Sequence, residues 1–441
     1  MKRKVLSTLL ALMIAITTVG CGSTPSNKTK EEVQVPDTEE VQSETETKSD
    51  VTLTVAIWDK NQEPGLRQIM DDFTAQTGIK CDIQITPWKD YWTMLEAATT
   101  GGNMPDVFWM HAFQVSTYAQ YEDVLLNLSD KIASSDKVDL SKYPEDIVKV
   151  YQNADGKQVG IPKDVDSSAV WYNKKMFDDA KIPYPTADWT WEDFREISKK
   201  LTKEDGSQFG LAMKPGSDQE SWYSAIYAYG GKIISDDMKT SGFDDPNTLT
   251  GMKIIEGIIQ DGSMPPYAIQ AENETVALQE AGTVAMTFQG SWMASELGVN
   301  DYLKENIGIA PLPKGPEGTC SMYNGLAWSA SAMGDHTEEA WKLVEYLGSK
   351  EAQEKQAELG VTLSALEGAS AAWANSVEGF DLSPYLDVME GAVLYPHSKN
   401  TTVWYSMMKE KLVSAWDGTR SMEEVCKEIA ADMNQMLSEE E

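Results

Sequence analysis

The chain has 441 residues, of which 41% are hydrophobic and 24% charged, and its formal net charge is −33. Because this length exceeds one ordinary hydrophobic core, it indicates two domains. So acidic a chain should repel nucleic acid and anionic lipid headgroups, which excludes both as expected partners.

The first 20 residues predict a secretory signal. Three basic residues at 2–4 precede a largely apolar run over 5–19, and Gly20 precedes Cys21. That pattern is typical of exported chains, and the run is shorter than the roughly 20 residues that span a bilayer. Residues 18–21 resemble a bacterial lipoprotein lipobox, with Thr18 where that motif usually has Leu. The resemblance implies lipidation of Cys21.

Residues 22–50 consist mainly of Ser, Thr, Glu, Lys and Pro. Such a segment buries too little apolar surface to offset its conformational entropy, so we expect 21–50 to form a disordered tether behind the lipidated cysteine. Beyond Cys21, only Cys81, Cys320 and Cys426 remain, which permits at most one disulfide. We expect three buried thiols instead.

The body opens with a strand, a helix and a strand. Apolar residues alternate over 51–58 and again over 79–85, while 64–78 has apolar residues at helical spacing. This βαβ pattern predicts parallel strands covered by helices. Trp58, Asp59 and Gln62 would then follow the carboxyl end of the first strand, where open α/β sheets bind ligands.

Further elements follow in chain order. Helical spacing predicts helices over 91–98 and 118–128, and 105–111 reads as a strand that places Trp109 and His111 at a carboxyl edge. Residues 167–172 predict an alternating strand. Thr190 should cap a helix over 191–201, because an acidic residue stands three positions on.

The stretch 282–292 predicts a strand over 284–288, followed by a loop over 289–291 that ends in Trp292. A loop held by a buried strand can present a side chain to a ligand, but Trp292 could equally pack between domains. Near the end of the chain, helices are expected around Trp341, around Trp404 and after Ser421, with Thr337 as the cap of the first.

Motifs for several chemistries are missing from the sequence. We find no Gly-rich phosphate loop, nucleophile elbow or His-rich metal spacing, and therefore expect no metal, cofactor or catalytic residue. The histidines His111, His336 and His397 are far apart. Carboxylates are abundant, so a glycosidase pair is not excluded by counting.

Tryptophan is the informative residue type. There are 14 tryptophans, and several stand at strand ends or beside glycine. Each alone also fits core packing, but together they favour a cleft in which at least three stack on sugar rings. The six are Trp58, Trp109, Trp222, Trp292, Trp328 and Trp404.

Residues 51–441 resemble the extracellular solute-binding proteins of bacterial ABC importers, in their sugar-binding, maltose-binding-like branch. The resemblance rests on 105–111, 161–173, 282–292, 307–313 and 323–327 in this order and spacing. It implies an α/β, two-lobed periplasmic-binding-protein-like (type II) fold with discontinuous lobes and a hinge cleft. It also implies no enzymatic activity, a monomer, and a saccharide ligand passed to permease subunits.

The resemblance also places the lobes and the chain crossings between them. The lobes would be 51–163 with 327–366, and 166–324 with 367–441. The crossings would lie near 162–166, 325–329 and 361–367.

The resemblance further implies a set of ligand contacts. Trp109, Trp292 and Trp404 would stack on sugar, with Trp222 near a third cleft aromatic. Asp164 or Asp166 would bind hydroxyls near the first crossing. Further contacts are implied for Trp58, Asp59, Gln62, His111 and Asn324. Ala112 and Phe113 replace charged residues of the maltose binder, which argues against maltodextrin as the ligand.

Other functions are also compatible with the sequence, some with the same fold and some with a different one. The same fold could bind a polyamine, an amino acid or iron; amino-acid binders usually need an arginine, whereas iron binders need a tyrosine cluster. A secreted glycoside hydrolase is a further alternative. A repeat-based adhesin is disfavoured because the sequence has no fixed-period repeat.

Overall fold

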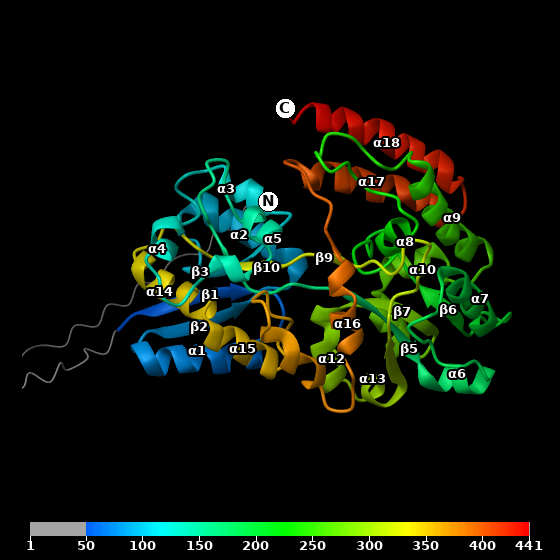
Figure 1. Ribbon diagram of the computed structural model, residues 1–441, viewed down its shortest axis with the longest axis horizontal. Coiled ribbons are helices and arrows are strands. Elements are labelled where there is room, and N and C mark those ends of the chain that lie inside the picture. Colours follow the sequence, from blue (N-terminus) through cyan, green and yellow to red (C-terminus); the bar gives the residue numbers. More distant parts are fainter. Residues whose placement is uncertain (1–49, 441) are drawn as a thin grey trace, which may run out of the picture. The chain divides into compact units, whose positions relative to one another are not determined.

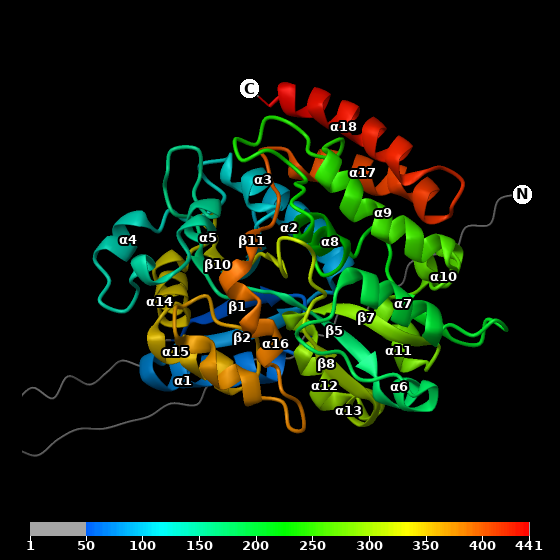
Figure 2. The same ribbon diagram turned by 45° about the vertical axis from the view of Figure 1, so that its right-hand side comes forward.

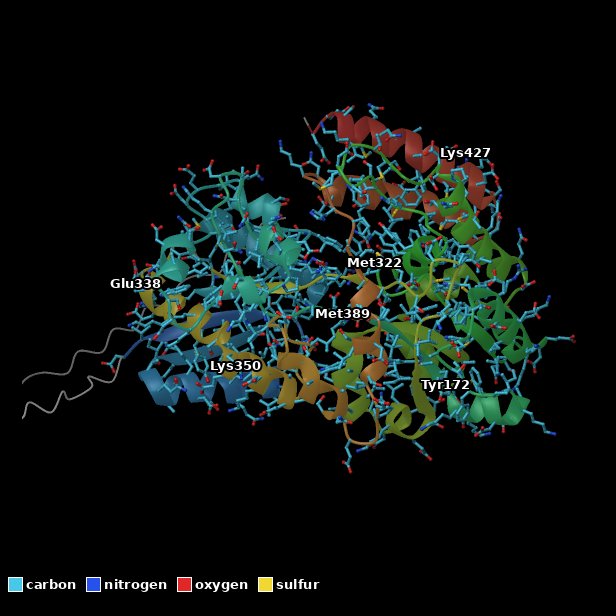
Figure 3. The ribbon with its side chains drawn as sticks, in the orientation of Figure 1. Tyr172, Met322, Glu338, Lys350, Met389 and Lys427 are labelled. Carbon is cyan, nitrogen blue, oxygen red and sulfur yellow. The ribbon has the colours of Figure 1, made fainter. Side chains whose placement is uncertain are left out.

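The computed structural model describes residues 50–440. The predicted signal, Cys21 and all but the last residue of the predicted tether lie outside this range. The described chain contains two main β-sheets with helices packed around them (Figure 1). Charged side chains such as Glu338, Lys350 and Lys427 are exposed on helices (Figure 3), as expected for an acidic chain.

The first sheet has the strand order β2-β1-β3-β10-β4. β1 runs parallel to β2 and β3, whereas β10 runs antiparallel to both β3 and β4. The predicted βαβ unit is therefore confirmed. Its strands are β1 (Thr52–Ile57), β2 (Lys80–Ile85), β3 (Val107–His111), β4 (Ile161–Pro162) and β10 (Leu326–Ala330).

Helices pack against this sheet and against one another. α1 buries Leu66, Ile69, Met70 and Phe73 and ends at Gly78, whose φ of 75° is a conformation that glycine adopts without strain. α1 also packs against α14 and α15. The helices of this part are α1 (Glu63–Thr77), α2 (Trp88–Gly101), α3 (Val115–Ala119), α4 (Ser129–Ala133), α5 (Glu145–Val150), α14 (Thr337–Leu347) and α15 (Lys350–Glu358).

The second sheet has the strand order β6-β7-β5-β8. β5 lies between β7 and β8 and is antiparallel to both, while β6 is parallel to β7. Every residue of β5 and β7 is buried, as expected for inner strands covered on both faces. The strands are β5 (Ser168–Asn173), β6 (Phe209–Ala212), β7 (Val284–Gly290) and β8 (Ile307–Ala310).

The helices around the second sheet include a layer in which α17 packs on α18 and both contact α9 (Figure 2). Thr190 caps α7 in a capping box with Asp193, which confirms the predicted helix start. These helices are α6 (Lys174–Ala180), α7 (Trp191–Leu201), α8 (Trp222–Ala228), α9 (Pro246–Gln260), α10 (Tyr267–Glu272), α11 (Thr275–Glu280), α12 (Ala294–Val299), α13 (Asp301–Asn306), α17 (Thr401–Trp416) and α18 (Met422–Ser438).

Short elements connect the two sheets. β9 (Met322–Tyr323) pairs in parallel with β11 (Val393–Leu394) and leads into β10. We call residues 163–167, between β4 and β5, the first crossing, and residues 324–325, between β9 and β10, the second crossing. Asp164 of the first crossing forms a β-bridge with Ser364. The chain from 365 to 391 includes α16 (Ser383–Asp387) and the 3-10 helices η3 (Ala369–Asn375) and η4 (Met389–Gly391).

Strand directions place particular loops beside the crossings. In the first sheet, Leu326 pairs with His111 and Ala327 with Pro162, so both crossings leave the edge at which β1 and β3 end. In the second sheet, Ser168 pairs with Gly290, so β5 begins at the edge at which β7 ends. Loops after β1, β3, β6 and β7 therefore all face the crossings.

Several local predictions are wrong. β7 continues through Gln289 to Gly290, so residues 289–291 are not a loop, and Trp292 lies in a 3-10 helix, η2 (Ser291–Met293). Thr337 is the first residue of its helix, which has no side-chain cap. The sequence predicts a helix over 118–128, but α3 ends at Ala119. Turns and a β-bridge at Leu125 follow it.

The three cysteines of the described chain are free thiols, as predicted. Cys320 and Cys426 are buried, but Cys81 on the edge strand β2 is only partly buried. Burial raises the pKa of each thiol to about 12, which disfavours the reactive thiolate.

Buried apolar side chains form two large clusters. The first combines side chains of the first sheet with Ala169 and Trp171 of β5 and with α12 and α13, and the second combines the other apolar side chains of β5 with β7, α17 and α18. η3 packs against α15, whereas the lobe boundary predicted after residue 366 would put these two helices in different lobes. Within residues 50–440, no helix combines the length and the apolar character needed to cross a bilayer.

Candidate functional site

Trp58 lies in a cluster of aromatic rings at the carboxyl end of β1. Its ring centroid is 5.0 Å from Trp88, 4.9 Å from Tyr91 and 4.8 Å from Trp109, in edge-on arrangements. Trp109 is fully buried, whereas Trp58 is partly exposed and Trp88 is 45% exposed. An aromatic surface is therefore available at Trp58 and Trp88, with Trp109 beneath them.

Asp164 of the first crossing is enclosed by protein partners. Its Oδ1 accepts a hydrogen bond from the backbone of Leu326 at 2.7 Å, and its Oδ2 pairs with Lys163 Nζ at 2.7 Å. Lys163 is fully buried; its Nζ also donates to Gln62 at 3.0 Å and lies 4.7 Å from the centroid of the Trp109 ring. The Lys163–Asp164 pair thus connects the first crossing to the loop after β1, and both charges are compensated.

Asp166 has a different environment. Its Oδ1 accepts from the Asn324 backbone and from Gln219 Nε2, both at 2.7 Å. Its Oδ2 has no hydrogen-bond partner within the described residues, and the side chain is partly exposed. Burial, and secondarily the charge of Asp164, raise the pKa of Asp166. One carboxyl oxygen at the crossings therefore remains available to a ligand.

His111 and Asn324 stand next to Asp166. The backbone N–H of Phe113 donates to Nδ1 of His111 at 3.1 Å, which puts the proton of the neutral ring on Nε2. Burial lowers the pKa of His111 to about 3, so the ring is neutral at pH 7. The Asn324 amide lies 3.4 Å from Nε2, and its oxygen should face Nε2, because Oδ1 otherwise has no partner in the described chain.

Trp292 reaches the crossings from the second sheet. A Cβ on Gly290 would lie 2.2 Å from the Trp292 ring, so the ring rests on the glycine backbone and requires a glycine there. Trp292 is partly exposed and pairs with no other aromatic ring within residues 50–440. One turn further along, Glu296 accepts a hydrogen bond from Asn61, which follows β1.

Three of the tryptophans expected at the sugar are not accessible, because Trp109 is fully buried beneath Trp58 and two others are enclosed elsewhere. Trp222 and Trp404 are fully buried, and their indole N–H groups donate to Pro215 and Ser398. Neither ring presents a face to solvent, which favours a packing role for both. Asp59 is partly exposed and accepts hydrogen bonds from Asn61 and Gln62 at 2.8 and 3.1 Å.

Sequence reasoning missed the loop that follows β6. Asp218 accepts hydrogen bonds from the hydroxyls of Tyr395 and Tyr405. Glu220 is partly buried, and desolvation together with the charge of Asp218 raises its pKa to about 8. The only local signal was a polar run, Asp218 to Glu220, just before the aromatic-rich helix α8.

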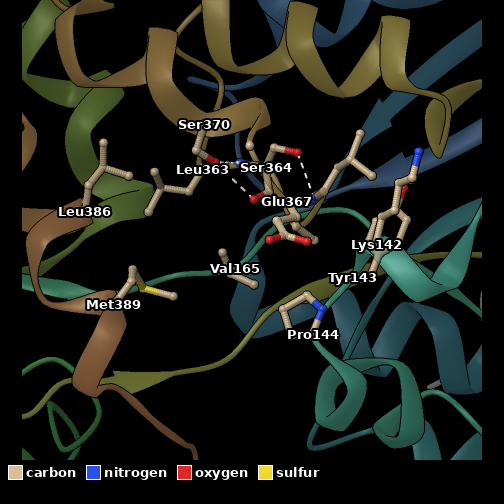
Figure 4. A pocket seen from close by; sticks show the side chains of 13 residues that line it. Lys142, Tyr143, Pro144, Val165, Leu363, Ser364, Glu367, Ser370, Leu386 and Met389 are labelled. Atoms are coloured by element: carbon tan, nitrogen blue, oxygen red, sulfur yellow. Dashed lines mark hydrogen bonds between the residues drawn. The ribbon is translucent and has the colours of Figure 1, made fainter.

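A separate cavity lies beside the crossings. Its volume is about 400 Å³, and its walls are mainly apolar side chains from Val165 and the 363–368 segment, together with Leu386 and Met389 (Figure 4). None of the predicted ligand contacts lines it. In the described chain, no group of three or more His, Cys, Asp or Glu side chains is arranged to hold a metal ion.

Comparisons with solved structures identify the fold. An ABC substrate-binding protein of Listeria monocytogenes in complex with cycloalternan aligns with a TM-score of 0.79 and 21% identity, over 88% of this chain and 100% of that one. The GacH receptor of Streptomyces glaucescens aligns with a TM-score of 0.76 and 19% identity, over 88% and 99%. These likenesses confirm the two-lobed α/β fold expected from the sequence.

Sequence comparisons give the family. A galactooligosaccharide-binding protein of Bacillus subtilis is 26% identical over 312 residues, which cover 67% of this chain and 69% of the relative. A multiple sugar-binding protein of Streptococcus mutans is 25% identical over 326 residues, or 70% and 74%. The model of the family described as bacterial extracellular solute-binding protein matches residues 59–354. Because that match covers more than half of the chain, the protein belongs to the bacterial extracellular solute-binding proteins.

Proposed function

We propose that this protein binds a sugar or oligosaccharide outside the cell and delivers it to the permease of an ABC transporter. Relatives named for galactooligosaccharides and for multiple sugars support this ligand class. The observation that carries the proposal is the free Oδ2 of Asp166 at the crossings, which the chain segments after β1 and β7, carrying Trp58 and Trp292, also face.

Each of these groups has a role in saccharide binding. A carboxyl oxygen accepts hydrogen bonds from sugar hydroxyls, whether the group is ionised or protonated. The exposed parts of Trp58 and Trp292 would stack on the apolar faces of sugar rings. Asp59 would supply a further polar contact, whereas Asn324 is buried and its amide pairs with His111. Trp222 and Trp404 would support the site through packing.

The charges near Asp166 favour a ligand without a carboxylate. The arginines of the described chain pair with acidic side chains elsewhere: Arg67 with Glu63, Arg195 with Asp261, and Arg420 with Glu424 and Glu428. Lys163 is fully buried and engaged with Asp164. Neither an arginine nor Lys163 is therefore available near Asp166 to pair with the carboxylate of an amino acid.

The tyrosines near Asp218 argue against Fe(III). Tyr395 and Tyr405 donate their hydroxyl protons to Asp218, and burial raises the pKa of both. Fe(III) would need the phenolates that these raised pKa values disfavour.

The mechanism would be closure of two lobes about the crossings. We propose the division 51–163 with 327–366 and 166–324 with 367–441, supported by the membership of β4 and β10 in the first sheet and of β5 in the second. Closure would exclude water from the sugar and strengthen its hydrogen bonds. The closed form would then be recognised by the permease.

The test is a titration with neutral oligosaccharides, amino acids, polyamines and metal ions, followed by tryptophan fluorescence and calorimetry. We expect saturable binding of at least one saccharide and none of the other classes. Binding of an amino acid, polyamine or metal ion in place of every sugar would overturn the proposal. Chromatography of the bound sugar should show no cleavage, whereas turnover would indicate a hydrolase.

We also propose that the protein is a monomer, held at the outer face of the cytoplasmic membrane by lipid on Cys21. Labelling of cells with a radioactive fatty acid should mark the wild-type protein but not the Cys21→Ser variant, which should be released into the medium. Label in both proteins, or in neither, would contradict the anchor.

A further inference from the structure

Phe113 forms an aromatic bridge between the loop after β3 and the segment that follows β11. Its ring centroid is 4.6 Å from that of Tyr395 and 5.8 Å from that of Tyr405 in α17. On its other side, the Phe113 ring lies 4.5 Å from His111. Nearby, Ser116 Oγ donates to the backbone of Lys399 at 3.4 Å. Two segments distant in sequence therefore meet around one phenyl ring.

Phe113 belongs to a ring of contacts that leads through Asp218 and Asp166 and returns to Phe113. Tyr395 and Tyr405 donate to Asp218, and the next residue, Gln219, donates to Asp166. Asp166 accepts from the Asn324 backbone, and the Asn324 amide lies beside His111, which contacts Phe113. The bridge is thus connected to Asp166 from both sides through neighbouring residues.

A second contact spans the two sheets at a neighbouring pair of loops. Asn61 follows β1 and bonds to Glu296, which lies on α12 just beyond Trp292. β1 is adjacent to β3 in the first sheet, and β7 is adjacent to β6 in the second. The Asn61–Glu296 contact therefore lies beside Trp58 and Trp292, and the Phe113 bridge lies beside His111 at the neighbouring pair of loops.

We infer that Phe113 closes one end of the saccharide site and limits the length of the ligand. This inference rests on the proposed function. A phenyl ring is close in size to a pyranose ring, and Phe113 is only partly buried. Removing it would leave, beside Tyr395 and Tyr405, room for a further sugar unit against an aromatic wall. Shorter ligands would not use that space.

The experiment measures the affinity of a length series, from disaccharide to heptasaccharide, of whichever sugar binds the wild-type protein. In wild type, we expect affinity to fall beyond a short length. In Phe113→Ala, we expect the ratio of affinities for the longest and shortest sugars to rise by about tenfold or more. Phe113→Leu, which keeps apolar bulk, should give a smaller rise.

Phe380→Ala is the matched control, because it removes a partly buried phenyl ring from a segment outside the site. It should keep the wild-type length profile, and thermal melts should show that all variants are folded. An unchanged length ratio in Phe113→Ala, or an equal loss at every length, would overturn the inference. Failure of wild type to bind any saccharide would overturn the proposed function as well.

Discussion

Asp164 and Asp166 stand two residues apart in the first crossing, and their surroundings differ sharply. Both oxygens of Asp164 have protein partners, and its charge is matched by a fully buried lysine. Asp166 has partners on one oxygen only and is partly exposed. The same contrast separates Trp404, which is enclosed, from Trp292, which is not. Fully partnered groups maintain the fold, and incompletely partnered groups are free to bind.

Replacement of Asp164 by Ala should have the largest effect, on folding. The change leaves Lys163 buried without a counter-charge, which costs about 3–5 kcal/mol of unfolding free energy. Urea denaturation should reveal this as a lower midpoint. A loss below about 1 kcal/mol would mean that Lys163 finds water or another acceptor.

Asp166→Asn should instead weaken sugar binding. The amide keeps one oxygen for Asn324 and Gln219, but it replaces the free carboxylate oxygen with a donor. We expect a loss of about 1–3 kcal/mol in binding, typical of a desolvated hydrogen-bonding group left without its partner, with the urea midpoint nearly unchanged. Isothermal calorimetry measures the first quantity. Equal sugar affinities of variant and wild type would mean that Asp166, like Asp164, does not bind the ligand.

Trp292→Ala should reduce sugar affinity by more than about tenfold, or 1.4 kcal/mol, while the protein stays folded. Trp404→Ala is the contrasting variant, because truncation of a fully buried tryptophan costs about 3–5 kcal/mol of stability. Fluorescence titration and thermal melts together separate the two effects. Unchanged affinity in Trp292→Ala would show that this ring only packs against Gly290.

Glu220→Gln should change the pH dependence of stability. The folded protein holds the Glu220 proton up to a pKa of about 8, whereas the ordinary value is 4.5. The native state therefore binds more protons in this window, and stability falls as pH rises from 4.5 to 8. The melting temperature of the variant should fall less over that range. If the melting temperatures of variant and wild type fall equally with pH, the Glu220 side chain is in contact with solvent.

Elements specified by local spacing could be predicted from sequence. Alternation gave β1 and β2, and the Thr190–Asp193 spacing gave the start of α7. The end of β7 could not be predicted, because glycine usually ends a strand, whereas Gly290 stays paired with Ser168 and supports the Trp292 ring. The βαβ pattern gave the parallel direction of β1 and β2, but strand order within each sheet is a long-range property that periodicity does not supply.

The candidate site was only partly predictable for the same reason. Residues directly after strands, such as Trp58 and His111, could be placed at the carboxyl edge. The partners of Lys163 could not, because its contact with Gln62 spans 101 residues of sequence. Nor does local spacing distinguish an enclosed tryptophan such as Trp404 from a partly exposed one such as Trp292.

The position of Asp166 on a crossing has a consequence for the order of events in binding. Residues on an axis of rotation move least when two bodies turn about it, so Asp166 should keep its place whether the lobes are apart or together. A sugar that arrives at the open protein would then meet this carboxyl group first. Trp58 and Trp292, carried by different sheets, would reach the sugar later. Binding would begin at Asp166 on the rotation axis, and the later aromatic contacts would determine the dissociation rate of the sugar.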